Sequence, residues 1–498
     1  MTVFTRLLTH ALPLPLACAL LLAGCAVGPD YKRPDAPVSE AFKEADGTAG
    51  TADATAWRGD WKPAEPQDAL ARADWWTVFG DAQLDALMSE VQISNQNIKA
   101  AEAQYRQAVA SLQAARAGFF PTVDAQAGAS RARGASGNTL NGQSVTLGAT
   151  WEIDVWGRVR RQVESSEASA QASQADLAST LLSTQATLAQ SYFLLRVADA
   201  QKALLDRTVA DYAKSLQLVQ NQYAAGTAQR SDVLQSETQL KSAQAQQIDI
   251  QITRAQLEHA IAVLVGKPPA ALTLRADDFR TAPPRVPAAV PSQLLERRPD
   301  IGAAERRMAS ANAQIGVAQA AYYPTLSLSA SGGLTASTLA RWMSLPDRIW
   351  SIGGGLAGTL FDGGLRSAAK AQAVAVYDQT VANYRQTVLG AFQEVEDNLA
   401  AQRLLEQEAV VQNDALRSAR EALALVNNRY RAGTAGLLDV LTAQTSAYTA
   451  ERTALSIAGR QYTAAVVLIK ALGGGWHAPG AEAAQAAQAG ADQSVSQR

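Results

Sequence analysis

Few residues of this 498-residue chain have the types and spacing that catalysis or metal binding requires. Residues 353–358 (GGGLAG) match the spacing of a dinucleotide-binding loop, but they lie inside an alternating segment and do not open a helix after a strand. His259 falls in a predicted helix and His477 near the C-terminus, so they predict no metal cluster. No G-x-S-x-G nucleophile motif is present. The sequence therefore predicts no enzyme, no cofactor and no metal site.

Cys25 is the residue with the clearest predicted chemistry, which is covalent modification. It follows an apolar run over residues 11–23 that is too short to span a bilayer, and Arg6 supplies a positive charge before that run. Residues 22–24 (LAG) and Cys25 resemble the lipobox of bacterial lipoproteins. This resemblance implies that residues 1–24 are a signal peptide and that Cys25 carries lipid, so a palmitate label would attach to it. An ordinary signal peptide with an unmodified thiol is the alternative.

Composition limits the classes of partner and the kind of core. The 44 basic and 46 acidic residues give a formal charge of −2, which does not suggest a nucleic-acid surface. Aromatic residues make up 6% of the chain and small residues are abundant, which favours closely packed helices over a large globular core. After residue 24 there is no apolar run of 18 or more residues, so any membrane-spanning segments would have to be strands.

The chain contains one unit twice. Residues 221–234 (NQYAAGTAQRSDVL) match residues 428–441 (NRYRAGTAGLLDVL) at an offset of 207, and residues 116–126 match 319–329. A unit of this length, present twice, indicates a duplicated half rather than an array of short repeats. Proline-rich residues 278–299 separate the halves, because proline interrupts helices. The predicted parts are a signal peptide at 1–24, a lipid-anchored extension at 25–74, repeats at 75–277 and 300–475, the linker at 278–299 and a disordered tail at 476–498.

Segments that alternate between apolar and polar residues predict strands. Two predicted strands fall within about 121–156 and two within about 324–362, and the alternation is clearest at 144–155. Each strand is about ten to thirteen residues long, which suits a tilted strand that crosses a bilayer. Four strands are too few for a closed transmembrane barrel and would leave unpaired edges in lipid, so several chains would share one barrel. A soluble β-sandwich is the alternative.

Aromatic residues bracket both predicted strand pairs. Aromatic rings favour the boundary between lipid headgroups and hydrocarbon, which predicts that these residues lie at a membrane interface. A sandwich explains less well why they cluster at one end of each pair. The six residues are Phe119, Phe120, Trp156, Tyr322, Tyr323 and Phe361.

The other segments predict long paired helices, because they are rich in alanine and glutamine and carry apolar residues at coiled-coil spacings. The AGT stretches between paired segments predict the turns of two helical hairpins. Gly226 and Gly433 are expected to end the first helix of each hairpin. Asp232 and Asp439 are expected in the first turn of the next helix, where a negative charge suits the helix dipole. The four segments are 157–222, 231–265, 365–429 and 437–471.

A family resemblance rests on residues 74–110 (DWWTVFGDAQLDALMSEVQISNQNIKAAEAQYRQAVA), on residues 294–329 (LLERRPDIGAAERRMASANAQIGVAQAAYYPTLSLS) and on the segment around Cys25. They resemble the outer membrane factors of Gram-negative bacteria, the TolC/OprM-like channels, and most closely the NodT-type outer membrane efflux lipoproteins. The resemblance implies an α+β membrane protein in which three chains form one twelve-stranded β-barrel, with four strands each. The barrel would continue into a long periplasmic α-helical barrel of coiled-coil hairpins. The chain would then be lipid-anchored in the outer membrane and extend into the periplasm.

The same resemblance implies that the hairpin turns are periplasmic tips that contact an adaptor (membrane fusion) protein. Ordinary turn chemistry, which needs glycine whether or not a partner binds, is the alternative reading of these positions. The candidate contact residues are Gly226, Thr227, Gly433 and Thr434.

A gate is also implied near the second turn. Tyr430 and Asp439 match a gating tyrosine and aspartate of the family, and Asp232 occupies the equivalent position to Asp439 in the first repeat. Ala435 and Thr442 stand where some members carry an arginine and a second aspartate, so the polar latch of those members is incomplete here. A ring of three Asp439 carboxylates could still narrow the passage and attract cations. The alternative is that Asp439 only starts a helix.

The predicted function is a passive exit channel for small molecules in a tripartite efflux or type I secretion system. The expected partners are two further copies of the chain, a periplasmic adaptor, an inner-membrane pump of RND, ABC or MFS type, and outer-membrane lipid. A structural periplasmic coiled-coil lipoprotein without a pore is the alternative, although such a tether does not need alternating strands with aromatic ends. A lipid-anchored hydrolase is a third class, and the missing nucleophile and metal motifs argue against it.

Overall fold

The computed structural model describes residues 27–36, 42–44, 74–133, 135, 137, 139–277, 279, 298–338, 341 and 347–474. The predicted signal peptide, Cys25 and the predicted tail lie outside these residues. The chain divides into two compact units, called here the sheet unit and the helical unit. The sheet unit comprises Met1–Ala36, Ala103–Gln174 and Ala303–Gln386, and the helical unit comprises Pro37–Glu102, Ala175–Gly302 and Thr387–Arg498.

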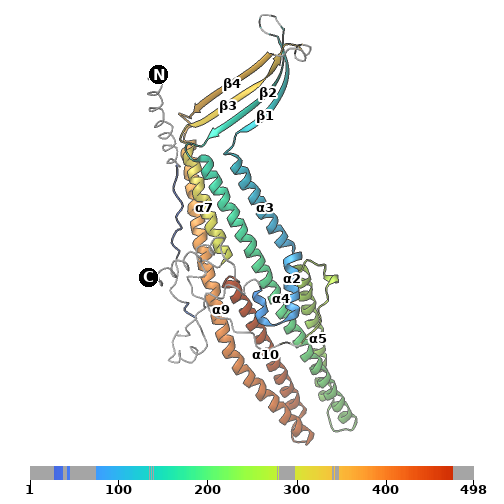
Figure 1. Ribbon diagram of the computed structural model, residues 1–498. Coiled ribbons are helices and arrows are strands. Elements are labelled where there is room, and N and C mark those ends of the chain that lie inside the picture. The colour runs from blue at the N-terminus through green and yellow to red at the C-terminus, as the bar shows by residue number, and fades with distance from the viewer. Residues whose placement is uncertain are drawn as a thin grey trace, which may run out of the picture. The chain divides into compact units, whose positions relative to one another are not determined.

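The sheet unit contains one four-stranded antiparallel sheet in the order β1-β2-β3-β4 (Figure 1). The strands predicted from alternation are therefore confirmed. β2 of the first repeat pairs with β3 of the second, so both halves of the chain contribute to the same sheet. The bounds are β1 (Thr122–Arg133), β2 (Thr139–Ile153), β3 (Thr325–Ala336) and β4 (Asp347–Ala357).

The strand register divides the sheet into two faces, because residues directly opposite each other on antiparallel strands share a face. Thr150 lies opposite both Thr122 and Ser329, and this defines the polar face. Val145 lies opposite Ala127 and Leu334, and this defines the apolar face. The larger side chains of the apolar face are Val123, Val145, Leu147, Trp151, Ile153, Leu326, Leu328, Leu334, Trp350, Ile352 and Leu356.

Long helices form most of the rest of the described chain, and the predicted hairpins are confirmed. α4 and α9 each have 67 residues, and each is followed across a short turn by a 35-residue helix, α5 or α10. Among the described residues, no helix is both long and apolar enough to cross a membrane. The bounds are α2 (Ala82–Ser94), α3 (Gln96–Ala117), α4 (Arg158–Ala224), α5 (Arg230–Leu264), α7 (Pro299–Ala320), α9 (Leu365–Arg431) and α10 (Leu437–Ala471), with short helices η2 (Trp75–Phe79) and η3 (Pro269–Ala271).

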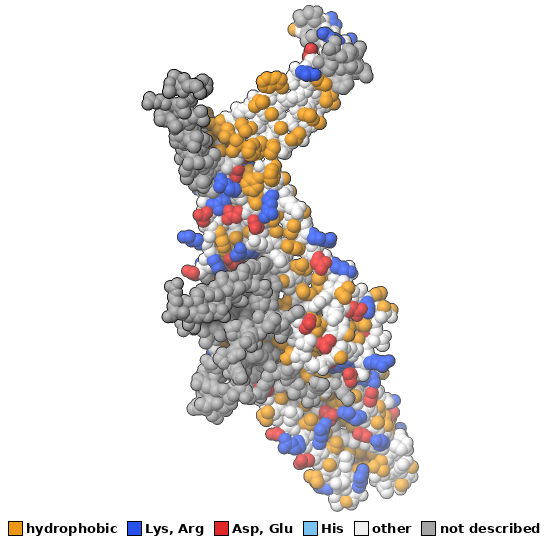
Figure 2. Space-filling view, viewed as in Figure 1, with side chains coloured by type: hydrophobic (Ala, Val, Ile, Leu, Met, Phe, Trp, Pro, Cys, Tyr) orange, Lys and Arg blue, Asp and Glu red, His pale blue; other side chains and the backbone are white. Residues whose placement is uncertain are grey.

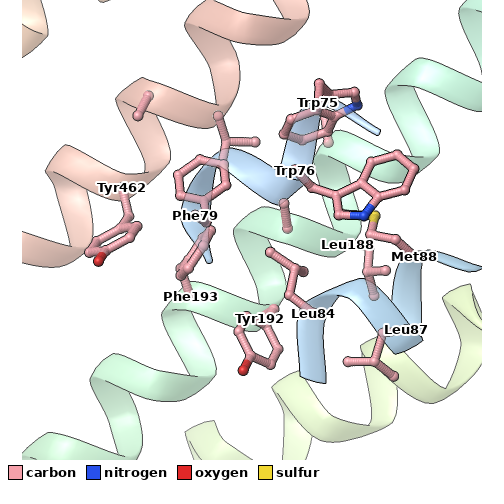
Figure 3. Close-up of a cluster of buried hydrophobic side chains, with 14 of the residues drawn as sticks. Trp75, Trp76, Phe79, Leu84, Leu87, Met88, Leu188, Tyr192, Phe193 and Tyr462 are labelled. Atoms are coloured by element: carbon pink, nitrogen blue, oxygen red, sulfur yellow. The ribbon is translucent and has the colours of Figure 1, made fainter. Parts of the chain in front are cut away.

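A cluster of aromatic side chains forms the main core of the helical unit (Figure 3). The ring of Phe193 on α4 packs against Phe79 and Tyr462, with ring centroids 4.8 and 4.4 Å away. Trp75 is buried, and its Nε1 donates to Oε1 of Gln185 at 3.2 Å. This aromatic core could not be predicted from the low aromatic content of the chain, because composition does not show which rings come into contact.

Asp81 starts helix α2 and ties it to α4. Its Oδ1 accepts hydrogen bonds from the backbone N–H groups of Gln83 and Leu84, both at 3.0 Å, which caps the helix. Its Oδ2 accepts a hydrogen bond of 2.6 Å from the hydroxyl of Tyr192. Burial, reinforced by this hydrogen bond, raises the pKa of Tyr192, so the phenol stays a donor at neutral pH.

The two repeats close the ends of α5 and α10 at equivalent positions. Asn95, just before α3, donates from Nδ2 to the carbonyl oxygen of Leu264 at 2.7 Å. Arg298, just before α7, donates from Nη1 to the carbonyl oxygen of Ala471 at 3.0 Å. Leu264 and Ala471 are separated by the 207 positions that relate the repeats. Each side chain satisfies a C-terminal carbonyl that has no partner within its own helix.

Gly266 is expected to tolerate alanine poorly, because its backbone is left-handed and crowded. Its φ is +73°, and an added Cβ would meet the backbone carbonyl of Ser94 at a separation that real contacts do not reach. Gly226 has a similar φ of +77° in open space, so it is the matched control. We expect Gly226→Ala to lower the free energy of unfolding by about 1 kcal/mol. We expect Gly266→Ala to cost at least twice as much, because the backbone clash adds to the conformational cost.

Thermal unfolding of the detergent-solubilised protein, followed by circular dichroism, measures both variants. Equal losses from the two substitutions would show that the chain near Ser94 relaxes without cost, which would contradict the predicted effect of crowding.

Candidate functional sites

The polar face of the sheet has the chemistry of a channel lining. Hydroxyl and glycine positions dominate it, and the hydroxyl oxygens of Ser331 and Ser351 lie 2.8 Å apart across β3 and β4. Its charged residues within the four strands are acidic. Two of its members, Asp124 and Asp347, are exposed, and a third, Glu152, accepts two hydrogen bonds from Arg158 at 2.9 and 2.7 Å. Such a surface can solvate polar solutes without selecting a single chemical class.

The apolar face exposes large hydrophobic side chains along the strands, and Figure 2 shows hydrophobic side chains gathered over the sheet. Trp350 and Ile352 of β4 are 78% and 79% exposed in the single chain. A patch of this kind marks a contact with lipid or with another protein. The strands have 11 to 15 residues, which is enough to cross the hydrocarbon core of a bilayer when tilted.

The outer strands of the sheet, β1 and β4, each pair with one neighbour in the described chain. Each therefore presents one edge whose backbone N–H and C=O groups have no partner within this sheet. Such edges cannot remain unpaired in hydrocarbon, where no water is available. The sheet is therefore complete only when other strands cover both edges.

The aromatic residues predicted at the membrane interface lie where the strands meet the adjoining turns and helices. The rings of Trp156 and Tyr323 stack with centroids 4.9 Å apart, and Trp156 Nε1 donates to the carbonyl oxygen of Pro324 at 2.7 Å. Phe120 and Phe361 are 69% and 89% exposed, Tyr322 is also exposed, and Phe119 is half-buried. Their position at the interface remains a prediction.

Residues 27–36, which the sequence predicted only as part of the lipid-anchored extension, run along the helices of the sheet unit. The N–H of Val27 donates to the carbonyl oxygen of Trp156 at 3.0 Å. Buried Arg161 donates to the carbonyl oxygens of Val27 and Gly28, both at 3.3 Å, and to Oδ1 of Asp30 at 2.9 Å. The segment two residues after Cys25 is therefore held beside a predicted interface tryptophan.

The two hairpin turns have the same geometry. Gly226 and Gly433 are left-handed, with φ of +77° and +74°, which glycine adopts without steric cost. The next residue in each turn, Thr227 or Thr434, donates from its backbone N–H and its hydroxyl to one helix-end carbonyl. These threonines close the turns, so turn chemistry accounts for all four predicted contact residues. The turns are nevertheless exposed and available to a partner.

The predicted gate residues have identifiable partners in the helical unit. The hydroxyl of Tyr430 donates to Oε1 of Gln222 at 2.8 Å, which joins the ends of α9 and α4 and therefore links the two hairpins. Oδ2 of Asp439 accepts from the N–H of Gly436 at 3.0 Å, and Oδ2 of Asp232 accepts from the N–H of Gln229 at 3.0 Å. Both aspartates thus act at the start of a helix. Sequence reasoning missed Gln222, because a glutamine in a glutamine-rich helix gives no local signal.

The paired aspartates allow the capping and gating readings of Asp439 to be separated. We expect Asp232→Ala and Asp439→Ala each to destabilise the helix start by about 0.5–1 kcal/mol, because each loses the same backbone hydrogen bond. Local hydrogen exchange at the start of α5 and α10 measures this loss. Single-channel conductance of both variants then tests the gate. A change confined to Asp439→Ala supports a gating role, whereas unchanged conductance leaves Asp439 with the capping role alone.

Toward the turns, the contacts within each hairpin differ from the contacts between hairpins, which farther along share the aromatic core of Phe193 and Tyr462. Apolar clusters hold each hairpin together: Tyr212 packs with Leu240 between α4 and α5, and Leu405 packs with Ile457 between α9 and α10. Between α5 and α10, single polar contacts bridge the hairpins, including the hydrogen bond of 2.8 Å from the hydroxyl of Tyr448 to Gln246. A groove of about 1020 Å³ lies between these helices near the turns. Its lining includes Leu234, Gln235, Thr238, Leu438, Leu441, Thr442 and Thr445.

Comparisons with known proteins agree with these features. A family model described as "Outer membrane efflux protein" matches residues 87–267 and 290–474. The antibiotic efflux pump outer membrane protein ArpC of Pseudomonas putida is 31% identical over 486 residues, covering 94% of this chain and 96% of that protein. The pyoverdine export outer membrane protein OpmQ of Pseudomonas aeruginosa is 32% identical over 444 residues, covering 86% and 92%.

A solved structure of the outer-membrane channel OprN has a similar fold. It superposes with a TM-score of 0.81 at 31% sequence identity, covering 91% of this chain and 100% of that chain. The similarity therefore extends over nearly the whole length of both chains.

Proposed function

Because this chain belongs to the outer membrane efflux protein family, we propose that it is the passive exit duct of a tripartite assembly, fed by an inner-membrane pump through a periplasmic adaptor. The chain is the outer-membrane channel component of an efflux system, and it works with pump components. Its fold is the α+β fold of trimeric outer-membrane channels, and it lies in the outer membrane and extends into the periplasm. The predicted family, fold class, function and location are thereby confirmed.

The sheet with two unpaired edges is the observation that carries the proposal. The apolar face suits lipid and the polar face suits a water-filled lumen, as in transmembrane barrels. Three copies supply twelve strands, and pairing of β4 of one copy with β1 of the next leaves no open edge. A coiled-coil tether without a pore has no use for such a sheet. The proposal assigns the chain no catalytic step, since transport energy comes from the pump.

The proposed cargo is small molecules that the pump selects. The polar face offers hydroxyls and a few carboxylates, which solvate many solutes and discriminate weakly among them. Relatives of similar identity are named for different cargoes, antibiotics for ArpC and pyoverdine for OpmQ. The identity of the pump therefore predicts the class of cargo better than the lining of this channel does.

We also propose that Cys25 carries the lipid anchor. Val27 is hydrogen-bonded to Trp156, so a lipid two residues earlier would enter the membrane near the interface aromatics. Labelled palmitate is expected to attach to the wild type and not to Cys25→Ser. Equal labelling of both would contradict this assignment.

Photo-crosslinking from residue 434 tests the adaptor contact. With Cys18 removed in the signal peptide and Cys25 lipidated, Thr434→Cys leaves one free thiol, at the exposed second turn. A photo-crosslinker attached there is expected to trap a periplasmic adaptor in irradiated cells. Gln393→Cys, an exposed position about ten turns away on α9, is the matched control and is expected to trap none. Equal capture at both positions, or no capture at 434 by an intact trimer, would remove the turns as the docking site.

Conductance in planar bilayers separates the duct from the tether. The wild type is expected to run as a heat-labile trimer from outer-membrane fractions and to conduct once its tips are opened. Zero conductance from a folded trimer with opened tips would favour the tether.

A further inference from the structure

Acidic and basic side chains within the four strands lie on opposite faces of the sheet. The register places every strand carboxylate on the polar face, and these are Asp124, Glu152 and Asp347. It places every strand guanidinium on the apolar face, and these are Arg131, Arg133 and Arg348. If charged residues were placed at random along the strands, acidic and basic side chains would occur on both faces. The location of all three arginines on the lipid-facing surface therefore needs an explanation.

The arginines lie toward the loop end of the apolar face, where Leu334 stands directly opposite Arg348. Figure 2 shows lysine and arginine side chains at the loop end of the sheet, away from the helices. Arg131 and Arg133 precede the loop between β1 and β2, and Arg348 follows the loop between β3 and β4. Because the helices extend into the periplasm, this end faces the outer leaflet. Charged groups are tolerated on a lipid face near the headgroups, where they can find polar partners.

Two of these guanidiniums have no ionic partner in the described part of the chain. Neither Arg131 nor Arg348 forms an ion pair there, and both are exposed. Arg133 donates from Nε to the carbonyl oxygen of Gly137 at 3.2 Å, which leaves its terminal N–H groups available. The arginines are therefore not held for an ion pair within the sheet.

Arg131 and Arg348 lie on opposite edges of the sheet, each nine residues from the helix-side end of its own strand, although the register across the sheet sets Arg348 level with Ala127. Arg131 is the ninth residue after Thr122, the helix-side end of β1, and Arg348 is the ninth residue before Ala357, the helix-side end of β4. Both helix-side ends face the same membrane surface. In a closed barrel β4 of one copy lies beside β1 of the next, so Arg348 of one copy comes next to Arg131 and Arg133 of its neighbour.

We propose that these arginines form a binding site for lipid phosphate groups of the outer leaflet at each seam between copies. The site rests on the closed trimeric barrel of the proposed function, and each copy supplies part of it. Guanidinium groups match phosphate oxygens with paired hydrogen bonds, which favours a phosphorylated lipid headgroup. The apolar face directly below supplies the surface for the acyl chains. A phosphorylated lipid so bound bridges two copies and strengthens the trimer.

Trimer stability in vesicles of defined composition tests the site. Purified trimers are placed in phosphatidylcholine vesicles, alone or with lipid A, and the temperature of trimer dissociation is read on gels. Lipid A is expected to raise this temperature for the wild type and not for Arg131→Gln/Arg348→Gln. The amount of lipid A retained through detergent exchange is expected to fall about tenfold or more in that variant, because charged hydrogen bonds are lost.

The matched control removes two charges elsewhere. Arg417→Gln/Arg460→Gln takes away exposed arginines of helical ion pairs, which contribute little, and is expected to behave as the wild type. Arg131→Lys/Arg348→Lys keeps the charge without the planar fork and is expected to retain lipid A at an intermediate level. If the glutamine variant does not assemble into trimers, the lipid A retained by the lysine variant, compared with that retained by the wild type, tests the site. Equal retention by wild type and variants, or equal protection by dephosphorylated lipid A or inorganic phosphate, would refute the site.

A crosslink across the seam between copies tests the closed barrel separately from the phosphate site. Ala129 and Trp350 lie on the same face as Arg131 and Arg348, two residues closer to the helix side, and each is seven residues from the helix-side end of its strand. A short bismaleimide is expected to join Ala129→Cys of one copy to Trp350→Cys of the next. A seam that crosslinks without lipid A dependence refutes the phosphate site alone, whereas a seam that does not crosslink refutes the closed barrel.

Discussion

Replacement of Arg298 by methionine is expected to lower the free energy of unfolding of the helical unit by about 3–5 kcal/mol. The Arg298 residue is 7% exposed, and its guanidinium contacts three separate groups. It forms a bidentate pair with Asp300 at 3.1 and 2.8 Å, and Nη1 donates to Glu394 at 2.8 Å and to the carbonyl oxygen of Ala471 at 3.0 Å. Methionine fills much of the volume but satisfies none of these acceptors.

The three acceptors are affected unequally by this change. Glu394 keeps an ion pair with Lys470 at 3.1 Å, and the side chain of Asp300 is 36% exposed and can be hydrated. The carbonyl of Ala471 loses the donor from Arg298, and it lies at the end of α10 beside the main core. Most of the expected cost therefore comes from desolvated acceptors rather than from the Coulomb attraction of the pair.

Asn95→Ala is the matched control, because Asn95 occupies the equivalent position in the first repeat. It removes a neutral hydrogen bond to Leu264 and the cap that Asn95 Oδ1 provides to the N–H groups of Asn97 and Ile98. The expected loss is about 1–2 kcal/mol. Urea unfolding of both variants in detergent gives the comparison. Equal losses would show that the charge and burial of Arg298 add nothing to the shared carbonyl contact.

The elements of this fold follow from local patterns that the sequence displays directly. Alternation predicted β2 at 144–155, and the strand runs from Thr139 to Ile153. Coiled-coil spacing predicted a helix over 365–429, and α9 runs from Leu365 to Arg431. These predictions are correct because the spacing of apolar side chains along the sequence indicates which face of an element is buried. A spacing of about 3.6 residues indicates a helix, and a spacing of two indicates a strand. The prediction that Gly226 and Gly433 end helices is also based on local structure, since φ is positive at both glycines.

The contacts that join distant segments could not be predicted, because they produce no periodic pattern of residue types in the sequence. Arg298 lies in the segment read as a proline-rich linker, yet its side chain is buried against the end of α10. Gln222 is one of many glutamines, and only the fold brings it to Tyr430. Residues 27–36 read as an extension after the lipid site, whereas the structure holds them on Arg161 and Trp156. The candidate gate was therefore found through resemblance and its partner through the fold.

Crosslinking the two hairpins at their ends is expected to abolish efflux, which is the largest functional effect predicted here. In the proposed gate, the turn ends of the two hairpins of each copy must separate before cargo passes. Tyr430 and Gln222 already meet at 2.8 Å, so Gln222→Cys/Tyr430→Cys places two thiols within reach of a short bismaleimide. A crosslinker with a cleavable disulfide makes the lock reversible.

The contacts of the helical unit explain why this lock would matter. Each hairpin is held by its own apolar cluster, whereas the contacts between hairpins near the turns are polar and bridge a groove. Exposed polar contacts exchange with water at little cost, so the turn ends of the hairpins can separate while the aromatic core, in which Phe193 of α4 packs on Tyr462 of α10, holds the hairpins together farther along. A covalent link between them removes that motion and leaves each hairpin intact. Cells carrying the locked protein are therefore expected to accumulate a pump substrate as a deletion strain does, and the reductant is expected to restore efflux.

The control applies the same chemistry within one hairpin. Asp206 of α4 and Gln247 of α5 are hydrogen-bonded at 2.6 Å, so Asp206→Cys/Gln247→Cys carries the same crosslink without joining the two hairpins. We expect this variant to transport as the wild type does, because separation of the hairpins leaves the distance between α4 and α5 unchanged. Full efflux through a completely crosslinked 222–430 variant would place the gate elsewhere. Loss of efflux in both variants would instead mean that each hairpin must change internally, and the proposal that the turn end of each hairpin moves as one unit would be wrong.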